Sequence, residues 1–292
     1  MKLALGTAQF GLDYGISNEG GRTSEEEART IVNCARNAGV EVIDTSPAYG
    51  TSEAVLGRIV PDGYARLVTK TPHFGTAVID DDCARLLVTS FEASLERLGR
   101  KAIDGLLIHG ADDLLKPGGG RLFSAMAKLR ENGLVRKIGV SIYSGRQIDD
   151  VMATFEIDLI QVPLNALDQR LIRGGHLDRL KSKGVEIHAR SAFLQGLLLM
   201  APDRWPAEFE PHFTQLRQFH DIAAELGLSP LRAALGFAMN LREVDQVVCG
   251  VNSLQQFQDL VEAAQTRFDS RAFDEVRCDD VDLIDPTRWK KH

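Results

Sequence analysis

Four side chains that can hold or move protons lie in the first 110 residues of this 292-residue chain: Asp44, Tyr49, Lys70 and His109. A tyrosine phenol has a pKa near 10, which is too high for easy proton donation at neutral pH. A lysine ammonium within about 4 Å would lower that pKa by up to about 3 pH units at an effective dielectric of about 20. An aspartate would keep the lysine charged and aimed, and a histidine would orient a carbonyl oxygen or share the proton. The set predicts general acid catalysis by Tyr49.

Polar residues also close the apolar runs in the rest of the chain. They are Ser141, Gln161, Asn165, Arg190, Ser191, Asn252 and Ser253. Each of these polar residues, and each of the first four, has an ordinary structural explanation when taken alone. His109 could be a hydrogen-bonded core histidine, and Lys70 could be a solvated strand end. Because the runs themselves are strongly apolar, polar residues at successive run ends predict one shared polar face.

Short apolar runs alternate with longer segments of helical periodicity along the chain. We expect strands at residues 3–8, 40–45, 66–70, 103–109, 137–142, 158–164, 185–192 and 244–251. We expect helices at residues 24–38, 52–59, 80–98, 122–132, 146–154, 175–183, 230–241 and 253–264, the first with a capping box of Ser24 and Glu27.

Strand–helix–strand units of this length require parallel pairing with right-handed crossovers, and eight of them close into a barrel. The predicted fold is therefore an α/β protein, a (β/α)₈ TIM barrel that forms a single domain over residues 1–292. Barrels of this kind carry their active sites at the C-terminal strand ends, where the polar residues lie. A doubly wound open sheet is the alternative, but no Gly-x-Gly-x-x-Gly turn follows the first strand. The run Gly118–Gly120 is expected to be a flexible loop.

Two segments lie outside this repeat. Residues 197–229, inserted after the seventh strand, are too long for a plain loop, and an amphipathic stretch around Leu216, Phe219 and Ile222 predicts a helix there. The insertion either walls the active site or is a surface excursion. The tail, residues 279–292, carries Trp289, which we expect to pack on a barrel helix rather than to fold over the pocket.

The composition excludes several classes of partner. A formal net charge of −7 argues against nucleic acids and anionic membranes. The four scattered cysteines have no zinc-site spacing, so we expect no metal site and a reducing compartment, the cytoplasm. The N-terminal apolar run is too short for a signal peptide, and no run approaches the roughly 18 apolar residues of a membrane span. We expect a soluble protein.

The run Asp44-Thr45-Ser46-Pro47-Ala48-Tyr49-Gly50-Thr51-Ser52-Glu53 resembles the Asp-Thr-Ala-x-x-Tyr-Gly-x-Ser-Glu signature of the aldo-keto reductase family, with Ser46 in the alanine position. Lys70 in Leu-Val-Thr-Lys and His109 in Leu-Leu-Ile-His-Gly match the rest of that family's catalytic tetrad. The resemblance extends from the first strand to the last helix. It implies reduction of an aldehyde or ketone by NAD(P)H, or the reverse oxidation, with Tyr49 protonating the carbonyl oxygen as hydride reaches the carbon.

The same resemblance implies which residues bind the cofactor. Ser141, Gln161 and Asn165 would hold the nicotinamide amide. The other expected cofactor contacts are Gly6, Thr7, Asp44, Arg190, Ser191, Gly250, Asn252, Ser253 and Gln256. Ser253 at a helix N-terminus suits a phosphate.

Two places depart from the family pattern. Arg190 stands where many members stack an aromatic residue on the nicotinamide, so it would either stack there or bind an anionic substrate. Asn252 and Gln256 stand where members that prefer NADP often carry arginine or lysine, although a 2′-phosphate favours a cation. We therefore predict comparable use of NAD, or weak discrimination of the 2′-phosphate.

Three other functions stay open at this point. A barrel that binds a nicotinamide cofactor and senses redox state would keep the same residues with little turnover. An unrelated lyase or isomerase would use Lys70 as a Schiff-base amine, although a neighbouring carboxylate would keep that lysine protonated. A metal-dependent hydrolase is disfavoured, because no two histidines have His-x-His or His-x-x-x-His spacing.

Overall fold

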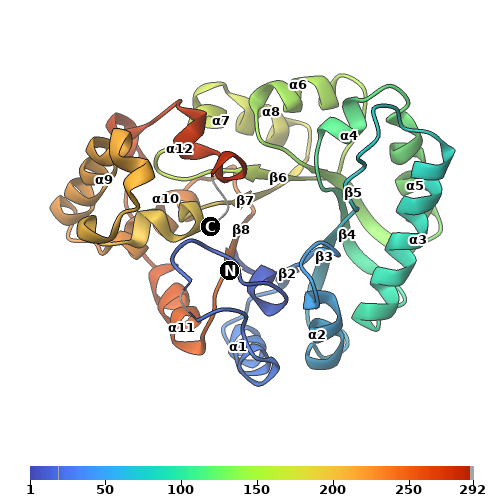
Figure 1. Ribbon diagram of the computed structural model, residues 1–292, viewed down its shortest axis with the longest axis horizontal. Coiled ribbons are helices and arrows are strands. Elements are labelled where there is room, and N and C mark those ends of the chain that lie inside the picture. Colours follow the sequence, from blue (N-terminus) through green and yellow to red (C-terminus); the bar gives the residue numbers. More distant parts are fainter. Residues whose placement is uncertain (19, 290–292) are drawn as a thin grey trace.

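The computed structural model describes residues 1–18 and 20–289, and Figure 1 shows a ring of helices around a central barrel of strands. The strands are β1 (Leu3–Gly6), β2 (Val42–Asp44), β3 (Arg66–Lys70), β4 (Ile103–Ile108), β5 (Val135–Ser141), β6 (Leu159–Pro163), β7 (Glu186–Arg190) and β8 (Gln246–Gly250). Each strand is parallel to its neighbours in chain order, and β1 pairs with β8, so the sheet is closed. The predicted (β/α)₈ barrel is confirmed.

Helices connect the strands and follow the last one. The α-helices are α1 (Glu25–Asn37), α2 (Ser52–Ile59), α3 (Asp81–Leu98), α4 (Asp112–Leu115), α5 (Gly120–Glu131), α6 (Gly145–Met152), α7 (Arg170–Arg173), α8 (His176–Ser182), α9 (Phe213–Glu225), α10 (Pro230–Met239), α11 (Leu254–Ala263) and α12 (Val281–Ile284). The 3₁₀ helices are η1 (Ala8–Phe10), η2 (Leu194–Leu199), η3 (Pro202–Arg204), η4 (Ala207–His212), η5 (Ser270–Val276) and η6 (Pro286–Arg288). The eight predicted strands and eight predicted helices agree with these elements to within two residues at each end.

The glycine run before α5 is not the flexible loop that the sequence suggested. Gly120 begins α5 itself. A Cβ atom at Gly119 would lie 2.1 Å from the carbonyl oxygen of Leu114, and one at Gly118, where φ is +83°, would lie 2.1 Å from that of Ile79. These two residues are glycine because the packed backbone leaves no room for a side chain.

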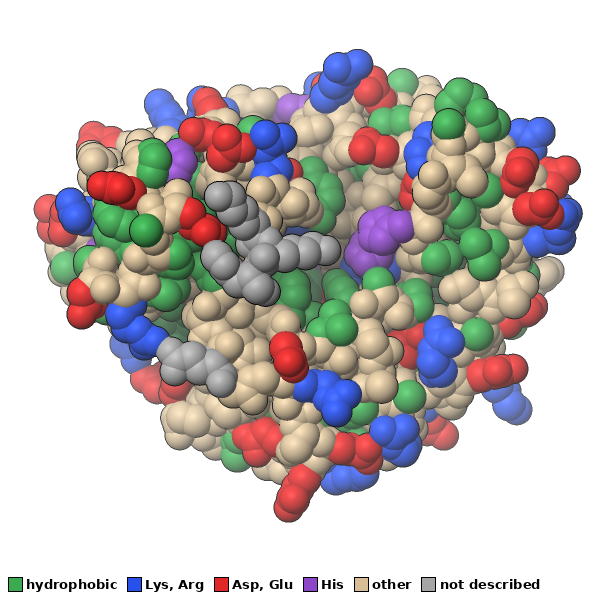
Figure 2. Space-filling view, viewed as in Figure 1, with side chains coloured by type: hydrophobic (Ala, Val, Ile, Leu, Met, Phe, Trp, Pro, Cys, Tyr) green, Lys and Arg blue, Asp and Glu red, His purple; other side chains and the backbone are tan. Residues whose placement is uncertain are grey.

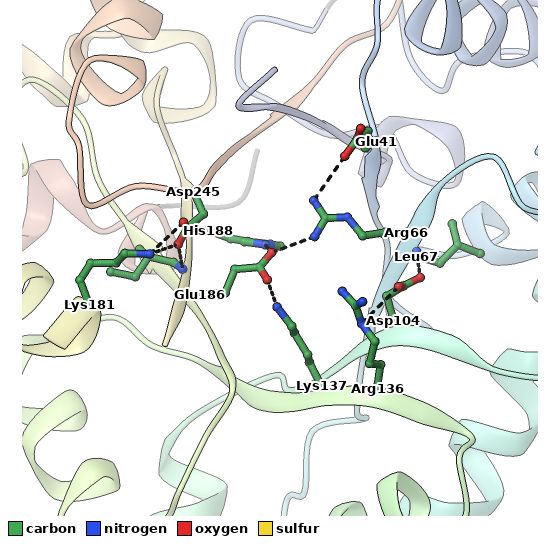
Figure 3. Close-up of polar contacts among 11 residues, drawn as sticks. Glu41, Arg66, Leu67, Asp104, Arg136, Lys137, Lys181, Glu186, His188 and Asp245 are labelled. Atoms are coloured by element: carbon green, nitrogen blue, oxygen red, sulfur yellow. Dashed lines mark hydrogen bonds and ion pairs between the residues drawn. The ribbon is translucent and has the colours of Figure 1, made fainter. Parts of the chain in front are cut away.

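The inside of the barrel contains layers of side chains, because alternate residues of a strand point to the same side. An ionic layer lies nearest the N-terminal strand ends (Figure 3): Glu186 of β7 contacts Arg66 of β3 at 3.4 Å, Lys137 of β5, and His188 at 2.9 Å. The hydrogen bond from His188 and the contact with Lys137 hold the pKa of Glu186 well below its usual range. An apolar layer above it consists of Ala4, Val42, Val68, Leu107 and Leu159. The layer at the C-terminal strand ends is polar.

The segment inserted after β7 packs on the outside of the barrel, and Leu199 near its start also lines the cavity at the C-terminal strand ends. Its predicted helix is confirmed as α9, whose buried Phe219 lies 5.5 Å, ring to ring, from Phe273 of η5. Trp289 lies 4.8 Å from the ring of Phe209 in η4, so it packs on the insertion and not on a barrel helix as expected. The last three residues of the predicted tail, 290–292, lie outside the described residues.

Within the described ranges, no single helix is long and apolar enough to cross a membrane. One pair of helices, Ala207–Glu225 and Pro230–Met239, is long and apolar enough when taken together, but the two are bent by 89° relative to each other.

Candidate active site

A cavity of about 780 Å³ opens at the C-terminal ends of the strands. Figure 2 shows this face hollowed near its centre, with a histidine side chain at the edge of the hollow. The cavity wall contains the predicted site residues Gly6, Thr7, Asp44, Tyr49, Lys70, His109, Ser141, Gln161, Arg190, Ser191, Gly250, Asn252 and Gln256. The fold thus brings the four proposed acid–base residues to one cavity. Two other predicted residues, Asn165 and Ser253, are not part of its wall.

Lys70 and Asp44 form a buried ion pair at the ends of β3 and β2. Lys70 Nζ donates to Asp44 Oδ1 at 2.7 Å, to Asp44 Oδ2 at 2.8 Å and to the carbonyl oxygen of Thr45 at 3.0 Å. The two side chains are only 1% and 4% exposed. Gln161 Nε2 also donates to Asp44 Oδ2 at 2.9 Å. A lysine ammonium held by three acceptors is a poor Schiff-base nucleophile, which argues against the lyase alternative.

Tyr49 lies beside this pair, on the turn that follows β2. Its ring centroid is 5.2 Å from Lys70 Nζ. The turn is pressed against the loop after β1, because a Cβ atom at Gly11 would lie 1.8 Å from the carbonyl oxygen of Tyr49. In return, a Cβ atom at Gly50, where φ is +56°, would lie 2.4 Å from the carbonyl oxygen of Gly11. Only glycine fits at either position, and this contact between the two loops fixes the backbone of Tyr49.

The pKa of Tyr49 is raised above its ordinary value, which corrects the expectation that Lys70 would lower it. Burial is the largest cause, because it penalises the charged phenolate, and the carboxylate of Asp44 raises the pKa further. The positive charge of Arg190 acts in the opposite direction. Asp44 also lies directly against Lys70 and offsets its charge. Tyr49 is therefore held as a phenol, the form that can donate a proton.

His109 follows β4 and is held in its neutral form. Burial is the largest cause that lowers its pKa to about 3, and the positive charges of Lys70, His73 and Arg190 lower it as well. The ring of His73 stacks on the ring of His109 at 4.3 Å, and the ring of Tyr49 lies nearly perpendicular to that of His109, 6.2 Å from it. A neutral imidazole offers one N–H donor and one acceptor.

Ser46 contacts the imidazole of His109 on its Nδ1 side. Ser46 Oγ accepts a hydrogen bond from the backbone N–H of Ala48 at 3.1 Å and lies 3.4 Å from His109 Nδ1. Ser46 Oγ can donate or accept in this contact, and donation to Nδ1 would leave the ring proton on Nε2. This contact depends on the residue that replaces the alanine of the signature.

The last two residues of the motif, Ser52 and Glu53, begin α2 and support the site from behind. Ser52 Oγ is 2.9 Å from the carbonyl oxygen and 2.8 Å from the hydroxyl of Thr7. Glu53 accepts from Thr69 Oγ1 at 2.6 Å and from Arg97 Nε at 2.8 Å, and its side chain is 2% exposed. These contacts tie the loops after β1 and β2 to β3 and α3. Neither residue is part of the cavity wall.

Arg190 ends β7 and reaches across the barrel mouth to the end of β5. Its Nη2 donates to the carbonyl oxygen of Ile142 at 2.9 Å, and its Nη1 donates to Ser191 Oγ at 3.2 Å. The guanidinium carbon lies 4.2 Å from the ring centroid of Tyr143. One face of the guanidinium is therefore covered by an aromatic ring of the protein itself.

The N-terminus of α11 is capped by the chain's own side chains. Ser253 Oγ accepts from the backbone N–H of Gln256 at 3.3 Å, and Gln256 Oε1 accepts from that of Asn252 at 2.8 Å. Ser253 thus acts as a helix cap outside the cavity.

A carboxylate also lies at this helix N-terminus, where the sequence suggested a phosphate. The predicted capping box is only half formed, because Ser24 Oγ accepts from Glu27 N at 3.2 Å without a reciprocal bond from Glu27. Glu27 Oε1 instead accepts from the backbone N–H of Leu254 at 2.6 Å. A negative charge here is favourable for the helix and unfavourable for a second anion.

Asn165 is fully buried and is used inside the loop after β6. Its Oδ1 accepts from the backbone N–H groups of Leu167 and Asp168, both at 2.9 Å, and its Nδ2 donates to the carbonyl oxygen of Ser191 at 3.2 Å. The structure therefore does not bring Asn165 to the cavity as predicted.

Comparison with known proteins agrees with this geometry. The model of the aldo/keto reductase family matches residues 2–278. The chain belongs to the aldo/keto reductase family. Enzymes of this family reduce carbonyl compounds with NAD(P)H.

Individual aldo/keto reductase relatives match most of the chain. It is 28% identical over 286 residues to L-galactose dehydrogenase of Arabidopsis thaliana, which covers 90% of this chain and 86% of that protein. It is 32% identical to an aldo-keto reductase of Mycolicibacterium vanbaalenii, over 64% of this chain and 69% of that one. A solved aldo-keto reductase from Bacillus halodurans, in its holo form, shares the fold with a TM-score of 0.74 at 20% identity and covers 100% of this chain and 94% of its own.

The cavity wall fits the nicotinamide cofactor of an aldo/keto reductase. The wall extends from Tyr49 to Gln256 on α11. The volume of the cavity lies within the range of ligand pockets in proteins. Gln9 Oε1, in the wall, is a buried acceptor without a hydrogen-bond partner among the described residues. A Cβ atom at Gly250 would lie 2.3 Å from this oxygen, so the wall stays free of a side chain there. Ser141 and Gln161 offer further polar atoms elsewhere in the wall.

Several residues of the reductase cavity were not predicted from the sequence. They include Gln9, Tyr14, Asn18, His73, Tyr143, Gln195, Asp259 and Thr287. Gln9, His73 and Tyr143 each follow a strand end by two or three residues, which is a signal that would have found them. Thr287 comes from the tail and Asp259 from the middle of α11, and no local pattern marks either one.

Proposed function

We propose that this aldo/keto reductase reduces an aldehyde or ketone to an alcohol with NAD(P)H, with Tyr49 as the general acid. One observation carries the proposal: a phenol kept protonated lies beside an ammonium that is fixed on both oxygens of Asp44. The Asp44–Lys70 ion pair keeps a positive charge beside Tyr49. His109, as a neutral imidazole, would donate a hydrogen bond to the substrate.

The bound nicotinamide would supply the hydride for reduction. The Tyr49 hydroxyl and His109 Nε2 would each donate a hydrogen bond to the substrate's carbonyl oxygen, which positions the carbonyl group. As negative charge develops on that oxygen, Tyr49 transfers its proton to it. The ammonium of Lys70 then lies beside the phenolate that remains, and Asp44 keeps that ammonium charged. General acid catalysis of this kind contributes about 10²–10⁴-fold in rate.

Replacing Tyr49 by phenylalanine tests the acid. The Tyr49→Phe enzyme should lose at least about 100-fold in kcat, because only the transferable proton is removed. Its dissociation constant for NADH, measured by fluorescence, should not change. Tyr64→Phe is a matched control, because the Tyr64 hydroxyl donates to the carbonyl oxygen of Val40 at 2.8 Å and is not in the cavity wall.

Wild-type turnover by Tyr49→Phe would show that another group donates the proton. If no compound in a broad panel of aldehydes and ketones oxidised bound NADH over many turnovers, the redox-sensing barrel would be favoured instead.

We also propose that NADH and NADPH bind with comparable affinity. Glu27 places a carboxylate on the N-terminus of α11, and the side chains of Asn252 and Gln256 are uncharged. A 2′-phosphate near this helix would therefore lack a cationic partner.

Fluorescence titration should give dissociation constants for NADH and NADPH within about tenfold of each other, a difference of about 1.4 kcal/mol. Gln256→Arg should tighten NADPH binding selectively, because it supplies the missing cation. Gln255→Arg is the control, since Gln255 is exposed and bonded to Asp259. Strong preference of the wild-type enzyme for NADPH would contradict the proposal.

Our proposal for the cellular location is the cytoplasm. All four cysteines are free, which suits a reducing compartment. Cell fractionation against a cytoplasmic marker tests this.

A further inference from the structure

Arg190 is a cation in the catalytic cavity that no carboxylate of the described residues neutralises. The other cation of the wall, Lys70, is paired with Asp44. The remaining acid of the wall is Asp259, which lies on α11 and accepts from Gln255 at 2.9 Å. The end of the cavity that contains Tyr49 and His109 therefore carries an excess of positive charge.

The guanidinium of Arg190 is held in a fixed orientation with donors to spare. Stacking on Tyr143 and the bond to the Ile142 carbonyl oxygen fix its plane. Arginine has five N–H donors, and two of them are used, by Ile142 and Ser191. The other three have no partner within the part of the chain that the structure describes. A preorganised fork of this kind suits a planar, two-oxygen acceptor.

Arg190 also lies close to the groups that would act on the carbonyl. Its charge lowers the pKa of both Tyr49 and His109. The groups that act on His109 electrostatically are Lys70, His73 and Arg190, and each of them favours its neutral form. An anion that entered this end of the cavity would meet two cationic side chains, Lys70 and Arg190, of which only Lys70 is paired with a carboxylate.

We infer that Arg190 forms an anion subsite, and that the physiological substrate is a carbonyl compound bearing a carboxylate or phosphate group. This inference rests on the proposed carbonyl reduction. The anionic group would take the unused N–H donors of Arg190 and neutralise the excess charge of the cavity. The carbonyl group of the same molecule would then be placed at Tyr49.

Binding of alcohol products tests the subsite without turnover. The host is the Tyr49→Phe protein saturated with NAD⁺, titrated calorimetrically with glycerol 3-phosphate and 4-hydroxybutyrate, and with glycerol and 1-butanol as neutral counterparts. At least one anion should bind ten times or more tightly than its neutral counterpart. Adding Arg190→Met should abolish that advantage, and Arg190→Lys should restore part of it, because lysine keeps the charge and loses the fork.

A turnover experiment connects the subsite to catalysis. In the enzyme with Tyr49 intact, kcat/KM is compared for glyceraldehyde 3-phosphate against glyceraldehyde, and for succinic semialdehyde against butanal. Arg190→Met should lower kcat/KM for the preferred anionic aldehyde by ten times or more, mainly through KM, and lower kcat/KM for its neutral counterpart by a much smaller factor. Arg217→Met is the matched control, since Arg217 also lies over an aromatic ring, that of Phe213 at 5.9 Å, but is not in the cavity wall.

The outcomes separate the two proposals. A preference for only one anion would support the subsite and assign its ligand as phosphate or carboxylate. Loss of anion binding in Arg190→Met without turnover in any wild-type assay would support the subsite and reject the reductase. If anions bind no better than neutral alcohols, or if Arg190→Met weakens NADH binding and all aldehydes alike, Arg190 belongs to the cofactor site and the inference is overturned.

Discussion

Burial and the carboxylate of Asp44 together disfavour the phenolate form of Tyr49. It is buried, and the nearest negative charge is the carboxylate of Asp44, which also neutralises Lys70. The enzyme therefore holds its acid protonated before the reaction. Lys70 would become important only when the proton has left, because the new phenolate then competes with Asp44 for the ammonium.

The titration of Tyr49 should show this directly. In the cofactor-free protein, the ultraviolet difference between wild type and Tyr49→Phe should contain no phenolate signal at pH 10, because burial and Asp44 raise the pKa. Asp44→Asn should bring the midpoint down, since it removes a negative charge and frees the charge of Lys70. A wild-type midpoint below 10 would contradict this account.

The sequence allowed the residues of the tetrad to be predicted, but not their protonation states. Residue type and position at strand ends were enough to group Asp44, Tyr49, Lys70 and His109. The direction of the pKa change at Tyr49 depends on burial and on how closely Asp44 contacts Lys70, and both are three-dimensional quantities. For the same reason Asn165 looked like a cavity residue, although its amide is used within its own loop.

At the scale of elements, the loops after β1 and β2 hold each other in place. Gly11 and Gly50 allow the two backbones to approach, and Ser52 at the start of α2 bonds to Thr7. The position of Tyr49 therefore depends on a residue 38 positions before it in the sequence.

Gly11→Ala should move the Tyr49 turn. The new Cβ atom would lie 1.8 Å from the carbonyl oxygen of Tyr49, so one loop must shift. We expect kcat to fall by about tenfold, with a loss of about 1–3 kcal/mol in the free energy of unfolding. Gly75→Ala is the control, because no atom lies within 4 Å of the position of its Cβ. Equal kinetics for the two variants would show that the loop contact does not position the acid.

Helix and strand positions were predictable because long periodic segments carry a strong local signal. The short helices α4, α7 and α12 have four residues each, too few for a period to be recognised. The half-formed capping box could not be predicted from the sequence for a different reason. Glu27 has its partner 227 residues away at Leu254, and no local pattern can show such a contact.

At the scale of the whole molecule, the insertion and the tail pack on each other and on the barrel. Phe209 meets Trp289, and Phe219 meets Phe273. We propose on this basis that residues 1–292 form a single domain, and we expect one cooperative transition in urea.

The same urea experiments should show a loss of stability in mild acid. The pKa of His109 is about 3 in the folded protein and near 6.5 when unfolded, so between these values the unfolded chain binds more protons. The free energy of unfolding should therefore fall as the pH falls from 7 to 5. Glu186 adds its own loss only below its usual pKa, because its folded pKa is depressed.

His109→Gln should lose less stability than wild type between pH 7 and pH 5, since it removes the group that takes up the proton on unfolding. Identical slopes for the two proteins would show that His109 is not held neutral.

The two halves of the Asp44–Glu53 motif serve different purposes in the structure. Asp44 and Tyr49 reach the cavity, whereas Ser52 and Glu53 secure loops and a helix behind it. In a lineage that lost the reaction but still needed the barrel, the tyrosine would be free to drift while the Ser-Glu pair stayed. A match to the whole pattern therefore indicates the shared barrel, and only the positions of Asp44, Tyr49, Lys70 and His109 bear on the proposed reaction.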